Sequence, residues 1–199
     1  MEINTQTLFG IFIIVVILMY GYSTIEHLTN DLTTIKSNVD GKMYQVRNLP
    51  DKQEAADLLA KIRIKLEKLV DAMNKKYPDD SNVNQMVEKF NPNNITESPK
   101  SNKYTSYSIN KGEKIVFCIR QKNDTEELVD ENTVTFVAIH ELAHIMTKSV
   151  GHTEEFWDNF KRLLKESVKI GIYDRENYTN DPKEYCGIQV TDSPLDNGN

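Results

Sequence analysis

The sequence has few cysteines and no excess of positive charge, and each shortage disfavours a class of protein. Its 199 residues contain two cysteines, Cys118 and Cys186, which is too few for a scaffold built on disulfides. The formal net charge is -6, whereas a general binder of nucleic-acid phosphates normally carries a basic face. Nucleic acid is therefore disfavoured as a partner.

The two cysteines allow two interpretations. They can form one disulfide if the domain faces an oxidising compartment. Cys118, however, lies in the apolar run 114–120, which favours a small core residue without a bridge. The sequence leaves the pairing open and favours the second interpretation.

The chain does contain enough apolar sequence for one packed domain. Hydrophobic residues make up 39% of it and charged residues 27%, which disfavours wholesale disorder. The length suggests one compact domain with additional segments. We expect that domain at residues 51–195, behind an anchor at 1–25 and a tether at 26–50.

The anchor is expected to be a transmembrane helix. Residues 8–22 read LFGIFIIVVILMYGY without a charge, and the wider span 7–25 has 19 residues, which is long enough to cross a bilayer. The segment lacks the basic start and the Ala-x-Ala cleavage site of a signal peptide, so we expect it to be retained. Its apolar residues cover every face, which disfavours a helix buried in the domain.

The side of the membrane is less determined. Basic residues follow the expected span and none precedes it, which favours a single-pass protein with a cytoplasmic C-terminal domain. Three N-glycosylation triplets fit the opposite side, so the side stays open. Residues 26–50 are polar, have no sustained helical period and are expected to be the tether.

Helical periodicity begins after the tether. Between Ala55 and Met73 apolar residues recur at spacings of three and four, which predicts an amphipathic helix. It is expected to begin near Asp51 and to end before Tyr77, because Pro78 follows.

The next segments are shorter. A short helix is expected around 86–90, and residues 91–102 have the composition of a loop. The stretches 103–109 and 113–120 predict the two strands of a β-hairpin around Gly112.

The chemistry is concentrated in residues 132–148, a predicted helix that contains His140-Glu-Leu-Ala-His144. Residues four apart on a helix lie one turn above each other, so both imidazoles point the same way and can supply two ligands to a tetrahedral Zn²⁺. Glu141 can reach a water activated by the metal, take its proton during attack on a carbonyl and deliver that proton to the leaving amine. We therefore predict one zinc ion per chain and Glu141 as the catalytic base.

The third ligand is expected to be His152. Gly151 suits a turn that brings the chain back toward the metal, and Thr153 can cap the following helix. Glu154 and Glu155 would then lie in its first turn and serve the helix dipole. An alternative third ligand is Glu166, which lies 22 residues after His144 on that helix.

A residue that polarises the substrate carbonyl is also needed. Tyr173, Tyr178 and Tyr185 all follow the second helix and can place a phenol near the metal, although each can equally be an ordinary aromatic residue. We select Tyr185 as the second catalytic residue because Cys186-Gly187 then turns the chain.

A family resemblance is carried by residues 140–157, which read HELAHIMTKSVGHTEEFW. This run resembles the WLM, SprT-like and YgjP-like group of small zinc peptidases, related to the Spartan-type proteases. That group pairs His-Glu-x-x-His with a downstream histidine, often followed by Phe-Trp, although the gap to His152 is longer than is typical. The resemblance implies His140, His144 and His152 as zinc ligands, Glu141 as the general base, and Phe156 with Trp157 as the aromatic pair.

The resemblance also implies a fold and a substrate. The fold is an α+β minimal zincin-like domain with an active-site helix, a packing helix and a small antiparallel sheet. The substrate is a protein or peptide. Residues 107–194 resemble membrane-tethered members of large DNA viruses and protists.

The expected function is therefore a membrane-anchored zinc metallopeptidase. The alternative is a membrane-tethered scaffold whose structural zinc is closed by a fourth protein ligand, Cys186 for example. A further alternative is an inactive pseudo-peptidase, which the intact Glu141 disfavours.

Overall fold

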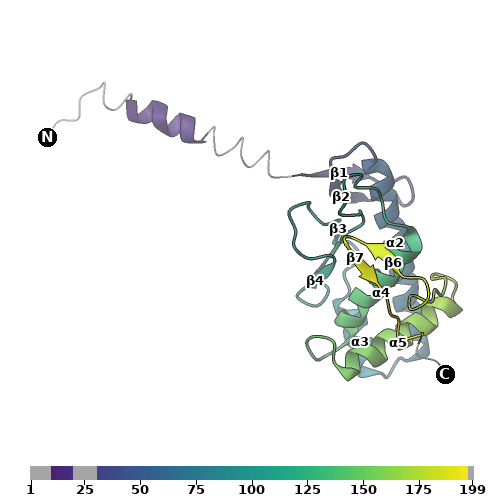
Figure 1. The fold of residues 1–199 in the computed structure, drawn as a ribbon. Coiled ribbons are helices and arrows are strands. Elements are labelled where there is room, and N and C mark those ends of the chain that lie inside the picture. The colour runs from purple at the N-terminus through teal and green to yellow at the C-terminus, as the bar shows by residue number, and fades with distance from the viewer. Residues whose placement is uncertain (1–9, 20–30, 197–199) are drawn as a thin grey trace.

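The computed structural model describes residues 10–19 and 31–196 (Figure 1). A helix covers residues 10–19, and the remaining elements follow in the order β1 (Leu32–Lys36), β2 (Met43–Arg47), α2 (Lys52–Lys76), α3 (Ser81–Lys89), β3 (Ile95–Glu97), β4 (Tyr107–Ile109), β5 (Lys114–Phe117), α4 (Glu131–Met146), α5 (Glu154–Lys169), β6 (Lys183–Tyr185) and β7 (Ile188–Val190). This confirms the α+β class.

The strands form two sheets. The larger has five strands in the order β1-β2-β3-β5-β4, and the smaller is the hairpin β6–β7. β2 and β5 both pair with β3 in parallel, whereas the pairs β1–β2 and β4–β5 are antiparallel. The larger sheet is therefore mixed, and the expectation of an antiparallel sheet is wrong. β4 lies at one edge of this sheet, so it pairs with β5 on one side only.

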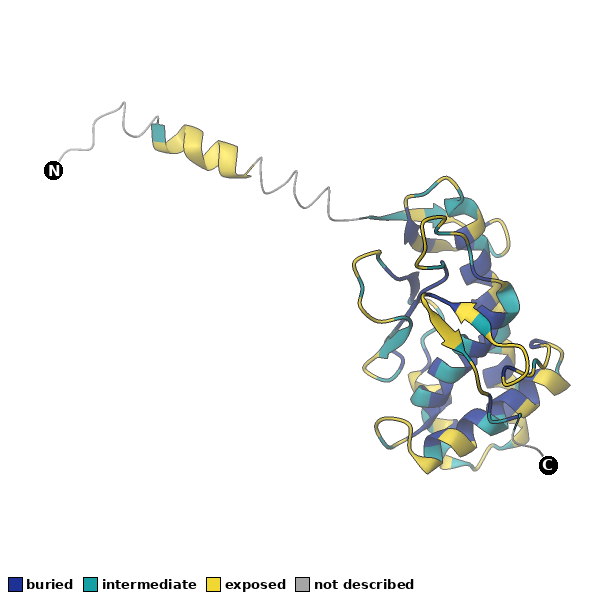
Figure 2. Cartoon of the chain, viewed as in Figure 1, coloured by how far each residue is buried: buried dark blue, intermediate teal, exposed yellow. Residues whose placement is uncertain are grey.

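Three long helices supply most of the core. α2 packs against the sheet and against α4, and its apolar repeat is buried as predicted, with Leu59, Ile62, Leu66 and Met73 fully inaccessible. α4 packs on α2, α3 and α5. Figure 2 shows that the buried residues lie where these helices face one another and the sheet. The nearly uniform burial of α4 agrees with its apolar composition on most faces.

Two segments expected to lack structure belong to the sheet. Residues 32–47 of the expected tether form the hairpin β1–β2, in which Tyr44 and Val46 are buried and Met43 and Gln45 are exposed. Residues 95–97 of the expected loop form β3, and all three are buried. Strands this short offer too few alternating positions for their period of two to be recognised. Their burial also comes from partners that are distant in the sequence, which leave no local pattern.

The expected membrane anchor is corrected. The described residues 10–19 are helical, and at about 1.5 Å per residue they account for only about half of a roughly 30 Å hydrocarbon core. No helix in the described ranges combines the length and the apolar character needed to cross a bilayer. Residues 7–9 and 20–25 of the expected span lie outside those ranges. This finding overturns the expectation of a single-pass membrane protein with a cytoplasmic C-terminal domain. The membrane as a partner stays a prediction.

Candidate metal centre

The site is built on α4, which presents His140 and His144 one turn apart. The helix begins after Asp130, whose carboxylate accepts a hydrogen bond from the backbone N–H of Thr133 at 2.9 Å. This is the N-cap arrangement that satisfies an otherwise free amide. Both histidines are half-buried, because the helix is in the core and only its cleft-facing side is open.

The third histidine comes from the loop after α4. Gly151 has φ +85, the positive value for which glycine suits a turn, and the Thr153 hydroxyl accepts from the backbone N–H of Phe156 at the start of α5. These two features confirm the predicted turn and cap. They leave the side chain of His152 exposed but directed at the other two imidazoles.

The three imidazoles converge through their Nε2 atoms. The distances His140–His144, His144–His152 and His140–His152 between these atoms are each 3.2 Å. Ligands about 2.0 to 2.1 Å from a tetrahedral zinc ion are separated by roughly 3.3 Å, so the spacing fits one such ion. The structure thus brings together the three histidines selected from the sequence in a cluster that can hold a metal.

A single aromatic ring underlies all three imidazoles. The ring centroid of Phe156 lies 4.9, 4.3 and 4.7 Å from those of His140, His144 and His152. Phe156 is fully buried, and its neighbour Trp157 is 5.6 Å from His152 on the exposed side. The aromatic pair therefore packs against the ligands and limits their rotation.

The environment keeps the two helical histidines neutral. Burial, with the neighbouring histidines, lowers the pKa of His140 to about 3 and that of His144 to about 4. A neutral imidazole is the form that binds a metal. Burial raises the pKa of Glu141 to about 7, although the backbone N–H of Ser108 opposes this rise.

The cluster opens into a cleft of about 770 Å³. One wall is the β4 edge with residues 105–111, the base is α4 with the histidines and Glu141, and the far wall is residues 185–192 of the C-terminal hairpin. A second cavity of about 390 Å³ is lined by the ion-paired Arg120 and Glu97 and includes none of the histidines.

Two alternative ligands are not in the cluster. The carboxylate of Glu166 is buried and pairs with Lys76, and Glu166 does not belong to the histidine cluster. Cys186 is bonded to Cys118 and cannot ligate as a thiolate. Within the described ranges, the group that can hold a metal contains three histidines and no fourth residue. A tetrahedral ion held by these three residues would keep its fourth position for water or a substrate.

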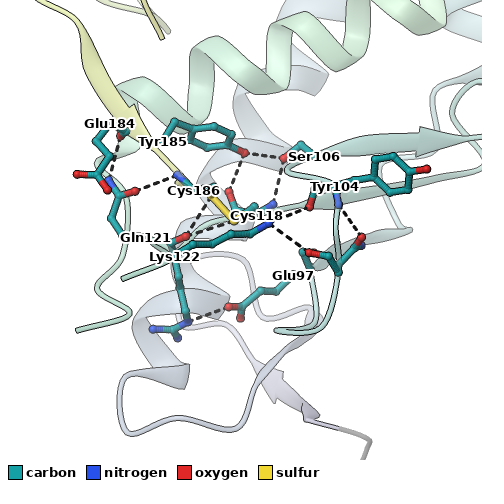
Figure 3. The surroundings of a disulfide bond; sticks show 12 residues. Glu97, Tyr104, Ser106, Cys118, Gln121, Lys122, Glu184, Tyr185 and Cys186 are labelled. Carbon is teal, nitrogen blue, oxygen red and sulfur yellow. Dashed lines mark hydrogen bonds and ion pairs between the residues drawn. A yellow bond between two sulfur atoms is a disulfide. The ribbon is translucent and has the colours of Figure 1, made fainter. Parts of the chain in front are cut away.

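The disulfide corrects the favoured interpretation of Cys118 as an unbridged residue. Cys118 is buried, as expected, but it joins Cys186 in the turn between β6 and β7 (Figure 3). The bond ties the far wall of the cleft to the end of β5. Sequence spacing alone does not reveal the pair, because the two residues are 68 positions apart.

Tyr185 lies next to this bond. Its hydroxyl donates to the Cys118 carbonyl at 2.8 Å and lies 2.6 Å from the Ser106 hydroxyl (Figure 3). Burial, assisted by the charge of Glu141, raises the pKa of Tyr185, so the phenol keeps its proton at neutral pH. Tyr185 also lines the cleft, and its role as a carbonyl-polarising residue stays a prediction.

The other tyrosines are core residues. Tyr173 donates to the Tyr178 hydroxyl at 3.2 Å, and both rings pack on Phe136. Sequence reasoning also missed a role of Glu155, which it assigned to the helix dipole. The Glu155 carboxylate instead accepts hydrogen bonds from the loop that carries His152.

The fold and the site together define an α+β domain able to hold one metal ion beside a carboxylate. Residues 38–195 match the WLM domain family. The chain belongs to this family, which confirms the resemblance found in the sequence.

Individual relatives differ in how much they share. Uncharacterized protein R325 of Acanthamoeba polyphaga mimivirus is 31% identical over 196 residues, which is 96% of this chain and 99% of that protein. Uncharacterized protein 136R of Invertebrate iridescent virus 6 is 36% identical over 93 residues, 46% of this chain and 48% of that protein. Among solved structures, Wss1 from Saccharomyces cerevisiae is similar with a TM-score of 0.48 and 21% identity, over 61% of this chain and 83% of that one.

Proposed function

We propose that this chain is a zinc-dependent peptidase that hydrolyses peptide bonds in protein or peptide substrates. The observation that carries the proposal is the triangle of three imidazole nitrogens, each 3.2 Å from the next, beside the buried carboxylate of Glu141 in an open cleft. Membership of the WLM domain family supports the same chemistry.

His140, His144 and His152 would hold the zinc ion. Three imidazoles with a free fourth position are the ligand set of a catalytic rather than a structural zinc site. When bound there, Zn²⁺ makes water a stronger acid and polarises a carbonyl oxygen. The open position therefore supports the peptidase over the scaffold with a closed structural site.

Glu141 is the proton carrier. It follows His140 directly on α4 and lines the cleft beside the imidazoles. As the oxygen of a water attacks the carbonyl carbon, the Glu141 carboxylate accepts one proton of that water. When the carbon–nitrogen bond breaks, the same carboxyl group gives this proton to the amine, so the residue returns to its starting state.

The edge strand β4 can align the substrate. β4 pairs with β5 on one side only, and residues 105–108 line the cleft. An extended peptide can add to a free strand edge through main-chain hydrogen bonds. Such pairing recognises backbone rather than sequence, which suits a peptidase acting on unfolded segments.

The test uses the full chain and one substitution. The purified protein should contain about one zinc per chain, and it should cleave an unfolded protein substrate. Glu141→Gln should retain the zinc and lose on the order of 10²- to 10⁴-fold in kcat, because the amide cannot accept the proton. Metal content is measured by elemental analysis and cleavage by the release of new amino termini.

The matched control is Glu154→Gln, an exposed glutamate on α5 outside the cleft lining. It should keep both zinc and activity. A parent chain without zinc would end the proposal, and so would a Glu141→Gln variant as active as the parent.

A further inference from the structure

The loop that supplies the third histidine has little packing of its own. Residues 147–153 connect α4 to α5, and of these only Thr147 is buried, while Val150 is 87% exposed. A segment with few buried contacts is not held in one conformation by the hydrophobic effect. Phe156 and Trp157 pack against the imidazole of His152, but the backbone of the loop that carries it must be held by polar contacts.

The Glu155 carboxylate accepts hydrogen bonds from Lys148 and Ser149 of this loop. Its Oε1 accepts from the backbone N–H of Lys148 at 3.2 Å, and its Oε2 accepts from the backbone N–H and the hydroxyl of Ser149 at 3.1 and 2.7 Å. The Ser149 hydroxyl is also 2.7 Å from that of Thr153. One carboxylate thus joins the start of α5 to the exit of α4.

The Lys111 ammonium group donates hydrogen bonds to backbone carbonyl oxygens of the same loop. Its Nζ donates to the carbonyls of Thr147, Lys148 and Ser149 at 2.6, 2.7 and 3.2 Å. These contacts use the three donors of an ammonium group. Lys111 comes from the turn between β4 and β5, so this contact ties the loop to the strand that borders the cleft.

The turn that carries Lys111 is itself closely packed. Gly112 has φ +113, and a Cβ added there would lie 2.6 Å from the carbonyl oxygen of Lys89 at the end of α3. The ammonium group of Lys111 is therefore presented from a fixed point on the fold rather than from a free surface loop.

We propose that Glu155 and Lys111 are positioning residues that set the metal affinity of the site by holding His152 in place. The proposal rests on the proposed zinc site. Neither residue belongs to the histidine cluster. Each binds the backbone between His144 and His152, so each acts on the metal through the conformation of the loop. Groups that orient metal ligands typically change the affinity about 10- to 100-fold when they are removed.

The chain offers a matched pair of glutamates for the test. Glu154 and Glu155 both lie in the first turn of α5 and interact alike with the helix dipole, but only Glu155 hydrogen-bonds residues 148–149. Full-length Glu155→Ala and Glu154→Ala are compared with the parent for zinc affinity, by competition with a chromophoric chelator. Substitution by cobalt gives an absorption spectrum that reports the coordination. Urea unfolding of the metal-free proteins reports the structural effect separately.

Glu155→Ala should bind zinc at least about tenfold more weakly, with a changed cobalt spectrum, while Glu154→Ala matches the parent. Glu155→Gln keeps one acceptor oxygen and should fall between the parent and Glu155→Ala. Lys111→Met keeps the stem without the ammonium group and should also weaken zinc binding, whereas Lys114→Met on β5 should not.

Two results would overturn the inference while leaving the zinc site intact. One is a parent that binds one zinc with Glu155→Ala binding it equally well. The other is an equal loss of affinity in Glu154→Ala, which would assign the effect to the helix terminus. A parent that binds no zinc would instead overturn the proposed function, and the inference with it.

Discussion

Removal of the Cys118–Cys186 disulfide should lower the stability of the domain by an amount that follows from the position of the bond. The two residues are 68 positions apart, and α4 and α5 with all three histidines lie in the loop between them. Closing a loop of that length in the unfolded chain is worth about 4 kcal/mol in the chain-entropy relation. With a urea m-value of about 2 kcal/mol per molar, the unfolding midpoint should fall by roughly 2 M.

The assay compares three forms of the full chain in the same chelating buffer, so that bound metal does not alter the comparison. These are the oxidised parent, the parent treated with a phosphine reductant, and the double variant Cys118→Ala/Cys186→Ala. Unfolding in urea is followed by far-ultraviolet circular dichroism. The reduced parent and the double variant should both unfold at lower urea than the oxidised parent, and the reductant should leave the double variant unchanged.

Equal midpoints for the oxidised and reduced parent would refute the reasoning. A double variant that loses stability while the reduced parent does not would assign the loss to the buried side chains rather than to the crosslink. Mass analysis of proteolytic fragments, with and without the reductant, establishes which form is present in each sample.

Two further predictions concern a glycine and the cleft tyrosine. Gly112→Ala should destabilise the fold by more than about 1–3 kcal/mol in urea unfolding, because strain from φ +113 is added to the 2.6 Å approach to the Lys89 carbonyl. Gly171→Ala has φ +68 but nothing within 4 Å of the new Cβ, so an equal loss there would contradict the role of the contact. Tyr185→Phe should lower kcat by about 10²-fold with unchanged zinc content, if the phenol polarises the substrate carbonyl. An unchanged kcat would limit its hydroxyl to the hydrogen bonds with Cys118 and Ser106.

The helices were largely predictable because their signals are local. The apolar repeat gave the limits of α2 closely, with Pro78 marking its end. The Thr153 cap and the aromatic residues after it gave α5. In each case the residues that define the element lie within a few turns of one another, so the chain itself carries the information.

The strands were predictable only in part. The hairpin β4–β5 was expected because two strand-like stretches, the second of them apolar, flank a glycine turn. β3 was missed because its three residues lie within 91–102, whose many Asn, Pro and Ser residues indicate a loop, and because Glu97 is charged. Its carboxylate is buried against Arg120 and accepts the backbone N–H of Arg47, which are 23 and 50 residues away. Burial that depends on such distant partners leaves no local pattern.

The site, like the fold, was predictable where its signals are local in the sequence and not where they depend on distant contacts. The spacing of His140 and His144 on a helix dictates that they share a face, and a turn at Gly151 brings in His152. The function of Glu155 could not be predicted, because it depends on the conformation of a loop that its own contacts help to define. The expected anchor shows the converse, since an apolar run predicted a membrane-spanning helix that the described residues do not contain.

The metal ligands and the ring beneath them are contiguous in the chain. His140 to Phe156 is one unbroken stretch, whereas the cleft walls come from residues 105–111 and 185–192. The candidate metal cluster is therefore encoded locally, whereas the shape of the cleft depends on segments that the sheet and the disulfide bring together. Changes in the two hairpins can alter the shape of the cleft without touching the histidine cluster, so the cluster and the access to it can vary independently in proteins built on this plan.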